Sequence, residues 1–401
     1  MIDISIEPDD LWLFSGSMIS FALCIFVLLG LLLKLRDTKS HRMFVWAMIG
    51  FFSINAADHL AELIYNPFIW GPAWLFQWHE IFLPCFMIAL YFFVRGLTSA
   101  APKLIRRDWL HLIPIALSFL CLSPALLLPG EIRRDPEAHD LSQDHLDLIQ
   151  LGDDAFWALW VVTVLIYGTL CARKLIQHKR NIRDVFSDLT GKTLAWLDAL
   201  VATILILSLI VIVDEVLDLL NYPEIRFGPT EFLFDLVLVF SFGLFALRAV
   251  PPLPGWTGAV LEPPVIEAPT PAPPSPKPDR YARSGLTPED LNRYADRLTQ
   301  RMEAGQLWRN HALSLRALAS EISIPSIHLS EVLNTKLGMS FYDYVNQCRI
   351  RDACELLATT SHTILEISET VGFNSKSTFN TSFKKVTEQT PSQWRAKHAR
   401  K

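Results

Sequence analysis

Residues 314–334, SLRALASEISIPSIHLSEVLN, contain two short apolar stripes on either side of Ser323-Ile324-Pro325. Helical spacing groups the first stripe as Leu315, Leu318, Ala319 and Ile322, and the second as Leu329, Val332 and Leu333. Two short helices joined by a three-residue turn form a helix-turn-helix pattern. The stretch therefore predicts one such pair of helices.

The pattern recurs in residues 363–395, TILEISETVGFNSKSTFNTSFKKVTEQTPSQWR. Thr363 is a suitable N-cap, Gly372-Phe373 forms the turn, and a second helix spans about 375–386. The inward residues of this pair are Ile364, Ile367, Val371, Phe379 and Phe383. Further helices are predicted over about 287–303 and 340–358 and from TPSQWR onwards. The C-terminal part is therefore predicted to consist of helices.

Composition and charge divide the chain into two parts. Half of the 401 residues are hydrophobic and the mean hydropathy is +0.28, which is too apolar for an ordinary soluble protein of this size. Residues 1–250 hold 18 basic and 26 acidic residues, whereas residues 280–401 hold 17 and 12. The basic part suits a polyanionic partner.

Apolar segments in the first 250 residues are long enough to cross a bilayer, which takes about 20 residues. Seven candidates lie at about 11–33, 43–65, 73–97, 109–129, 154–173, 194–216 and 231–250. The predicted fold class is all-α, with a seven-helix transmembrane bundle, a Pro-rich linker and a C-terminal domain with two helix-turn-helix units.

Loop charges predict the orientation. The loops 34–42 and 174–193 and the loop after the third span are rich in Lys and Arg, whereas the alternate loops are poor in them. Basic loops stay on the cytoplasmic side, so the N-terminus is outside and residue 251 is inside. In a bacterial inner membrane this orientation places the C-terminal domain in the compartment that holds the chromosome.

Residues 251–279 contain 11 prolines, which predicts a spacer that does not fold. It separates a membrane domain, 1–250, from a helical domain, 280–401. Such a spacer is too irregular to transmit a rigid rotation. We therefore expect signalling by proximity or dimerisation rather than through a continuous helical lever.

Ionisable residues inside membrane spans are costly, which makes them candidates for function. Those expected near the outer side are Asp58, His59, Glu62, His79, Glu80 and Asp235. They would line an outward-facing ligand pocket. The competing interpretation places acids of this kind, such as Asp214 and Asp218, among the lipid headgroups. His and carboxylate groups also suit metal ions, but no spacing here is diagnostic, so we predict no metal site.

Residues 290–397 resemble the DNA-binding domain of the AraC/XylS family of bacterial transcription regulators. Within 363–395 the resemblance is carried by the order Ile-x-x-Ile, Gly-Phe, Ser-x-Phe, Phe-Lys-Lys, Thr-Pro and Arg. A second long match is LSEVLNTKLGMSFYDYVNQCRIRDACELL, 329–357. The membrane half is similar to that of a membrane-bound subgroup through LYFFVRGL, 90–97, and the Trp109-Leu110-His111 and Pro114 region.

The resemblance implies two recognition helices in successive major grooves, about 34 Å apart. The residues carried over by position are Ser326, Ile327, Ser330 and Glu331 in the first helix, and Lys376, Ser377, Asn380 and Thr381 in the second. Asn can bond adenine and Glu can accept from cytosine. The lysines placed to contact phosphate are Lys336, Lys384 and Lys385.

Two positions depart from the family pattern. Thr381 stands where relatives often carry Arg, which weakens a phosphate or guanine contact. Glu388 stands where relatives often carry Gly, a residue suited to a left-handed turn. Both departures concern sequence preference rather than the apolar frame.

These observations predict a membrane-embedded, one-component regulator that is not an enzyme. Expected partners are promoter DNA, membrane lipid, an unidentified signal ligand, RNA polymerase and a second copy of the chain, with no cofactor. The alternative is a seven-span transporter or membrane enzyme with an attached DNA-binding reporter domain, supported by the same buried His and Glu residues. A third possibility is release of the C-terminal domain by proteolysis within the linker.

Overall fold

The computed structural model describes residues 8–37, 42–65, 72, 77–99, 103–134, 141–189, 193–219, 229–249 and 286–398. These residues form helices, and one residue pair, Phe186 and Ser314, forms an isolated antiparallel bridge. The chain divides into two compact units, Met1–Ile176 with Leu194–Pro254, and Gln177–Thr193 with Gly255–Lys401. The predicted linker, 251–279, lies outside the described residues.

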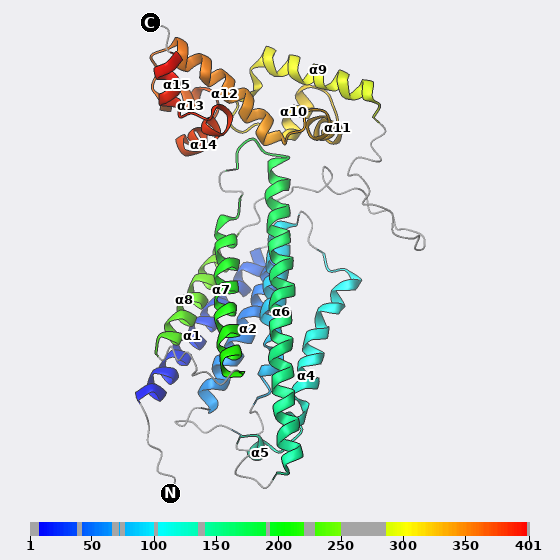
Figure 1. Ribbon diagram of the computed structural model, residues 1–401, viewed down its shortest axis with the longest axis vertical. Coiled ribbons are helices and arrows are strands. Elements are labelled where there is room, and N and C mark those ends of the chain that lie inside the picture. Colours follow the sequence, from blue (N-terminus) through cyan, green and yellow to red (C-terminus); the bar gives the residue numbers. More distant parts are fainter. Residues whose placement is uncertain are drawn as a thin grey trace. The chain divides into compact units, whose positions relative to one another are not determined.

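The first unit is built mainly from apolar helices, most of which are labelled in Figure 1. They are α1 (Pro8–Asp37), α2 (Arg42–Tyr65), α3 (Pro84–Thr98), α4 (Ile113–Leu126), α5 (Gly130–Arg134), most of α6 (Gln143–Arg183), α7 (Ala195–Leu219) and α8 (Pro229–Arg248). Within the described residues, five helical stretches are long and apolar enough to cross a membrane, and parts of α7 and α8 form shorter apolar helices. These stretches overlap five of the seven predicted spans, and the number of spans remains a prediction.

The third predicted span differs from the observed helix. Instead of a helix over 73–97, the chain has a turn at Gln77–His79, the 3-10 helix η2 (Glu80–Phe82) and then α3. Proline suits the first turn of a helix, because a backbone N–H at that place would have no helical hydrogen-bond partner and its loss costs nothing. Pro84 occupies that place in α3, so the α-helix begins after His79 and Glu80. A second 3-10 helix, η3 (Arg106–Leu112), precedes α4.

The fifth predicted span, 154–173, is the middle of a much longer helix. α6 has 41 residues, which at 1.5 Å per residue gives about 60 Å, or about twice the hydrocarbon core of a bilayer. Side-chain hydrogen bonds four residues apart, from Gln143 to Asp147 and from Gln150 to Asp154, support its first turns. Parts of the chain between the fourth and fifth predicted spans and of the predicted inner loop 174–193 are therefore helical, which corrects the sequence-based boundaries.

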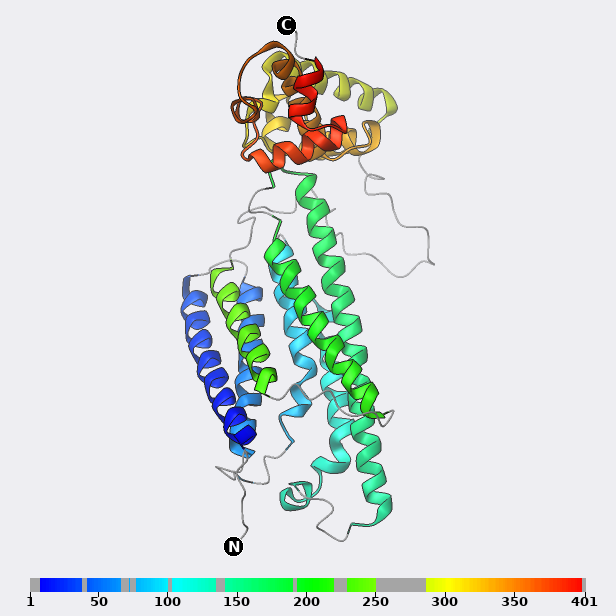
Figure 2. The same ribbon diagram turned by 60° about the vertical axis from the view of Figure 1, so that its left-hand side comes forward.

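The first and last helices of the first unit lie side by side. α1 packs against both α2 and α8, and Figure 2 shows α1 (dark blue) beside α8 (light green). Lys34 donates to the carbonyl oxygens of Ala246, Leu247 and Ala249 at 2.6–3.1 Å. A cation at the end of α1 thus satisfies carbonyl groups that the C-terminus of α8 leaves without helical partners.

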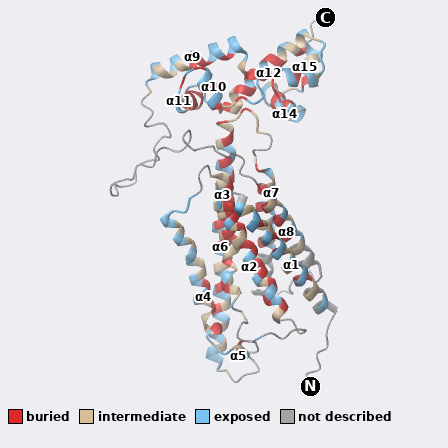
Figure 3. Ribbon diagram, turned by 180° about the vertical axis from the view of Figure 1, so that it is seen from behind, coloured by how far each residue is buried: buried red, intermediate tan, exposed pale blue. Residues whose placement is uncertain are grey.

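The surface of the first unit carries many exposed apolar side chains. Phe26, Leu120, Leu165 and Val237 are each more than 60% exposed. In Figure 3 buried residues concentrate on the inward faces of the bundle, whereas α4 is mostly exposed or intermediate. Apolar patches of this extent on a protein surface indicate contact with a membrane or a partner.

The second unit contains the helices predicted for the C-terminal part. They are α9 (Pro288–Gly305), η5 (Leu307–Arg309), α10 (Leu315–Glu321), α11 (Ser326–Glu331), the π-helical turn η6 (Val332–Lys336), α12 (Phe341–Thr359), α13 (Ile364–Thr370), α14 (Lys376–Thr387) and α15 (Pro391–His398). Thr287 caps α9 through a capping box with Asp290. The predicted break between α10 and α11 and the predicted apolar stripes are confirmed, because those residues are buried.

The long helix α12 joins two separate apolar clusters. Figure 1 shows it between α10–α11 on one side and α13–α15 on the other. Phe341, Val345 and Cys348 pack with α9, α10 and α11. Ile350, Ala353 and Leu357 pack with α13, α14 and Trp394 of α15. Each pair of short helices therefore has its own core, and one helix carries both.

The segment Gln177–Thr193 belongs to the second unit. From the sequence it was assigned to the membrane domain, as an inner loop. Its buried residues Ile182, Val185 and Ser187 are at most 4% exposed. Contacts between residues far apart in the chain thus decide where this segment packs.

Candidate nucleic-acid interface

The two helix pairs have turns of the same geometry. Ser323 after α10 and Gly372 after α13 both have a left-handed backbone, with φ of 53° and 96°. The next residue, Ile324 or Phe373, is buried and donates its amide proton to the carbonyl of the residue five positions earlier, at 3.0 and 2.9 Å. This hydrogen bond closes the end of the first helix and directs the chain into the second.

The second helix of the second pair, α14, presents one polar face. Ser375 caps it by accepting from Thr378 N at 3.1 Å, and Phe379 and Phe383 are fully buried. The exposed polar residues are Lys376, Ser377, Asn380, Thr381, Lys384 and Lys385. These are the six residues that the sequence assigned to DNA contacts in this half.

A groove of about 430 Å³ runs along this polar face. Lys376, Asn380 and Lys384 line one side of it, and Thr390 and Ser392 at the start of α15 line the other. Sequence reasoning did not assign Thr390 and Ser392 to the site. The sequence feature that could have pointed to Thr390 is its position as the cap of α15. In that position Thr390 N donates to Gln393 Oε1 at 2.9 Å.

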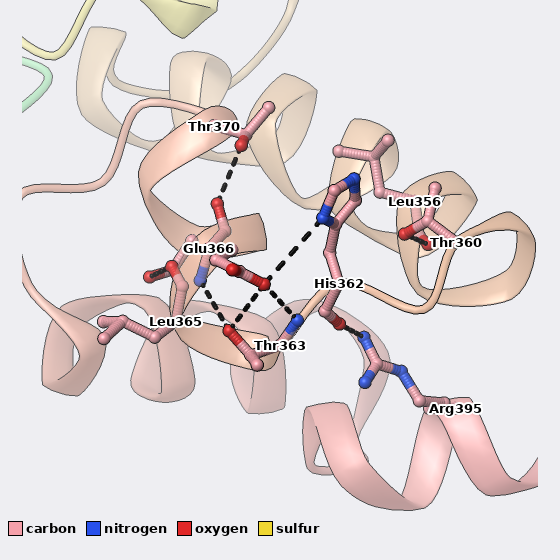
Figure 4. A network of polar contacts seen from close by, with 9 residues as sticks. Leu356, Thr360, His362, Thr363, Leu365, Glu366, Thr370 and Arg395 are labelled. Atoms are coloured by element: carbon pink, nitrogen blue, oxygen red, sulfur yellow. Dashed lines mark hydrogen bonds and ion pairs between the residues drawn. The ribbon is translucent and has the colours of Figure 1, made fainter.

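Figure 4 shows the polar contacts that hold the start of α13. Thr363 N donates to Glu366 Oε2 at 2.6 Å, and Glu366 N donates to Thr363 Oγ1 at 3.2 Å. The hydrogen bonds from the Thr363 backbone and hydroxyl, together with the nearby His362, lower the pKa of the Glu366 carboxyl. Arg395 of α15 donates to His362 O at 2.5 Å. α15 is thereby tied to the beginning of α13.

The second helix of the first pair, α11, offers fewer side chains. Ile327 is 43% exposed and Ser326 is partly exposed, and Lys336 is exposed at the end of η6. Ser330 and Glu331 are buried, at 1% and 6% exposure. The backbone continues from Glu331 into the π-helical turn, whose extra residue shifts the following side chains around the helix. Ser330 and Glu331 precede that turn, and their burial places them inside this half rather than on its outer face.

Arg349 on α12 connects the two halves from the interior. It is 1% exposed and donates to Trp308 O at 2.8 Å and to Asn310 O at 2.9 Å, while its guanidinium lies over the ring of Phe373. Burial lowers the pKa of Arg349 to about 10, so it remains charged at neutral pH. The carbonyl partners offset the cost of burying this charge.

Asp352, one turn further along α12, makes a second link to η5. Its carboxylate accepts from Arg309 Nε at 2.7 Å, from Arg309 Nη2 at 2.9 Å and from Trp308 Nε1 at 2.9 Å. Paired hydrogen bonds of this kind fix the geometry as well as the charge. Together with Arg349, Asp352 fixes η5 against the long helix.

Lys385 differs from the other lysines of the interface. Its ammonium donates to Asp343 Oδ1 at 2.9 Å, and the same carboxylate accepts from Arg183 at 3.0 Å. Although partial burial raises the pKa of Asp343, the hydrogen bonds from Ser340 and Lys385 and the charges of Arg183 and Lys385 lower it overall. Lys385 is thus engaged within the protein on the side of α14 away from Lys376.

Four of the six predicted pocket residues form two pairs in the first unit. His79 Nε2 lies 3.6 Å from Asp58 Oδ1, and His59 Nδ1 lies 3.3 Å from Glu62 Oε2. Ser17 of α1, which sequence reasoning missed, donates to the same Glu62 oxygen at 2.5 Å. Glu80 follows in η2, and the side chain of Asp235 lies outside the described residues. Among the described residues no group of three or more His, Cys, Asp or Glu side chains is arranged to hold a metal ion.

A second polar network lies between α3, η3 and α6 and was also missed. Arg95 donates to Asp108 Oδ1 at 2.7 Å and to Lys103 O at 2.7 Å. His111 Nδ1 lies 2.6 Å from Tyr167 Oη, and Asp108 and His111 line a cavity of about 580 Å³. Arg95 and His111 fall in the two stretches that carried the resemblance of the membrane half, which was the signal available in the sequence.

Comparison with known proteins places the C-terminal domain in a family. Residues 318–397 match the family model described as "Helix-turn-helix domain". An uncharacterized HTH-type transcriptional regulator of Staphylococcus aureus (strain COL) is 34% identical over 100 residues, which is 25% of this chain and 13% of that protein. The chain thus matches about an eighth of the length of that relative.

The probable transcription factor PqrA of Proteus vulgaris is 30% identical over 90 residues, which is 22% of this chain and 74% of PqrA. Among solved structures, the C-terminal domain of a two-component response regulator from Fusobacterium nucleatum is 31% identical, with a TM-score of 0.24, and the match covers 26% of this chain and 98% of that one. Through its C-terminal domain, the chain belongs to the AraC-type helix-turn-helix transcription regulators.

Proposed function

We propose that this chain is a membrane-embedded, one-component transcription regulator that binds promoter DNA through both of its helix pairs. The polar face of α14 carries the proposal, because Lys376, Ser377, Asn380, Thr381 and Lys384 are exposed on a helix whose opposite face is buried. A helix of this kind fits the major groove, where Asn can bond adenine in two places and Lys can bond guanine.

The groove beside α14 suits the DNA backbone. Lys384 supplies a charge, and Thr390 and Ser392 supply hydroxyl donors at the start of α15. Contacts of these types bind phosphate oxygens and position a protein on the duplex without specifying sequence. In the first half, Ser326, Ile327 and Lys336 are the residues proposed to contact DNA. Ser330 and Glu331 support α11 from inside.

Membrane embedding is supported by the long apolar helices and the exposed apolar side chains of the first unit. The outer pairs Asp58–His79 and His59–Glu62 are proposed to respond to a signal, because ionisable groups inside a bilayer are retained where function requires them. The proposed location is the bacterial inner membrane, with the DNA-binding domain in the cytoplasm. The proposed mechanism involves no catalysis.

Genome-wide mapping of crosslinked DNA with the intact chain tests the DNA-binding proposal. Wild type should give sharp peaks near genes whose transcripts change when the chain is deleted. Lys376→Ala combined with Lys384→Ala should remove the peaks, because these lysines lie on the polar face. Arg297→Ala combined with Arg301→Ala removes the same charge from exposed positions of α9 and should leave them. An equal loss of peaks in both variants would mean that DNA binding depends on the overall positive charge and not on the polar face of α14.

The alternative of a transporter or membrane enzyme uses the same His and carboxylate pairs, which suit proton transfer as well as sensing. Glu62→Gln separates the two functions. A sensor would keep its DNA peaks and change only the conditions under which the target genes respond. A transporter or enzyme would lose a transport or chemical activity, measured in vesicles that contain the full chain.

A further inference from the structure

The segment Gln177–Thr193 is joined to the DNA-binding domain by backbone pairing. Leu315 N donates to Val185 O at 2.8 Å, and Ser187 N donates to Leu313 O at 3.3 Å. Phe186 and Ser314 are therefore the opposed residues of an antiparallel pair without hydrogen bonds between them. The segment thus binds the chain just before α10, where the first helix pair begins.

Side chains extend this contact into the interior. Ser187 Oγ donates to Leu313 O at 2.6 Å, and Arg349 donates to Ser187 O at 3.1 Å and to Ser187 Oγ at 3.3 Å. Arg349 is the buried cation that also contacts Trp308 and Phe373. The segment therefore completes the hydrogen bonding of the residue that connects the two halves.

The same segment reaches the second recognition helix. Asn374 donates to Asp188 Oδ2 at 2.6 Å, directly before the N-cap of α14. Arg183 pairs with Asp343, and a cavity of about 330 Å³ is lined by Lys179 and Arg183 together with Thr381 and Lys385. Thr381 also lines the groove on the other side of α14. The segment therefore borders the surface proposed to face DNA.

We propose that Gln177–Thr193 is an intramolecular strap that competes with duplex DNA for one side of α14. This inference rests on the proposed function. With the strap bound, Thr381 and Lys385 line a cavity that the strap closes on one side. Asp188 holds a carboxylate near the N-terminal end of α14, where the helix dipole favours a phosphate. Two groups with the same charge cannot share that place, so DNA binding requires the strap to leave.

The strap also provides a route for signalling that does not use the linker. Its first residues, Gln177–Arg183, are the end of α6, and α7 begins directly after it. A change in either membrane helix would alter the position or strain of the strap. This differs from the sequence-based expectation of signalling by proximity alone, because a continuous helix leads into the contact.

A disulfide lock tests whether the strap excludes DNA. The full chain, with a protease site inserted in 251–279, carries Phe186→Cys and Ser314→Cys in inverted membrane vesicles. Opposed residues of this pair type lie close enough for a disulfide. In one portion of oxidised vesicles, cleavage should leave the two fragments linked until reductant is added. In a second, uncleaved portion, oxidation should lower the retention of fragmented genomic DNA about tenfold, and reductant should restore it. Either single substitution is the control.

Charge reversal tests the released state. Arg183→Glu opposes the Asp343 carboxylate, so the strap should dissociate more often. DNA retention should rise by about two- to fivefold, the effect expected for a partly exposed ion pair. Arg180→Glu makes the same change of charge at an exposed position of the same helix turn and should lower or leave retention. A rise is informative because added negative charge by itself weakens DNA binding.

The outcomes separate the strap from the proposed function. If wild type retains DNA and neither the lock nor Arg183→Glu changes that retention, the strap proposal is overturned. The proposal of a DNA-binding regulator would still stand. Lower retention with Arg183→Glu than with Arg180→Glu would overturn it as well, because the strap would then contribute to DNA binding. Failure to form the disulfide would show that the contact is not populated. If no form of the chain retains DNA, the proposed function fails and the strap fails with it.

Discussion

The two helix pairs of the C-terminal domain share a turn but differ in what they present. In the second pair, α14 has 12 residues, a side-chain cap and six exposed polar or cationic residues assigned to DNA. In the first pair, α11 has six residues, Pro325 caps it without a side-chain hydrogen bond, and it passes into a π-helical turn. Two of its four assigned residues are buried.

This difference indicates a division of labour. The second pair has the side chains to read bases, whereas the first has few and sits beside the residues that the strap contacts, Leu313 and Leu315. We expect the second pair to determine most of the sequence preference. The first pair is expected to determine the placement of the domain and its regulation.

The largest expected effect separates the two turns. Gly372 has φ of 96°, and a Cβ there would lie 2.7 Å from the carbonyl oxygens of Trp308 and Arg309. Gly372→Ala should lower the free energy of unfolding by about 3 kcal/mol, from the strained backbone and the overpacking together. Urea unfolding of residues 280–401 measures it, since both apolar clusters lie within that fragment.

Ser323→Ala is the control for this comparison. Ser323 already carries a Cβ in a left-handed conformation, so alanine should change the free energy of unfolding little. Equal losses at Ser323 and Gly372 would show that the two turns tolerate side chains alike, which contradicts the close backbone contact at Gly372.

A smaller effect is expected on DNA binding. Asn380→Ala should weaken binding to a duplex from a mapped peak by about 1–3 kcal/mol and relax the base preference at one position. Ser330→Ala should leave the affinity unchanged, because Ser330 is buried and Asn334 hydrogen-bonds to it. Fluorescence anisotropy with the intact chain in nanodiscs measures both. If Ser330→Ala weakens binding as much, the burial of Ser330 does not persist on DNA.

Relief of strain in the first turn should stabilise the domain. Ser323→Gly removes a Cβ from a left-handed conformation, which costs about 1–2 kcal/mol for most residues, while glycine loses about 0.5–1 kcal/mol more entropy on folding. A net gain of about 0.5–1 kcal/mol is expected in urea unfolding of the fragment. A net loss would mean that the Ser323 side chain contributes a contact of its own.

The smallest effect is a dependence on pH confined to the second pair. The pKa of Glu366 in the folded state lies below its ordinary value of 4.5. The contribution of its ionised carboxylate to the stability of α13 is therefore fully present above pH 4.5. The contribution is lost as the pH falls through the lower, folded value. The protection factors of the α13 amides against hydrogen exchange should therefore fall in acid more than those of α10, whose cap is Ser314. Glu366→Gln should abolish the difference.

Much of the helical framework could be predicted because its signals are local. Thr287 and Thr363 were recognisable caps, and the apolar residues of each short helix repeat at helical spacing. The break at Ser323-Ile324-Pro325 was predicted in the same way. The length of α6 was not, because the residues beyond its apolar middle are polar, and a hydropathy pattern ends where the bilayer would end.

The candidate site could be predicted only in part. Side chains on α14 were assigned correctly to an exposed face because helix periodicity places them opposite Phe379 and Phe383. Ser330 and Glu331 were assigned by position in the family pattern, and that pattern does not reveal which side of α11 packs against the rest of this half. Thr390 and Ser392 enter the groove through the docking of α15, which depends on contacts such as Arg395 with His362.

The sequence by itself determined the apolar segments, the two helix pairs, their caps and the family of the C-terminal domain. These depend on residues within about one or two helical turns of each other. The tertiary structure alone decided that Gln177–Thr193 packs with the DNA-binding domain and that Arg349 is buried at the junction of both halves. Such contacts join residues 162 positions apart, and no local pattern of hydrophobicity or charge specifies which distant surfaces meet.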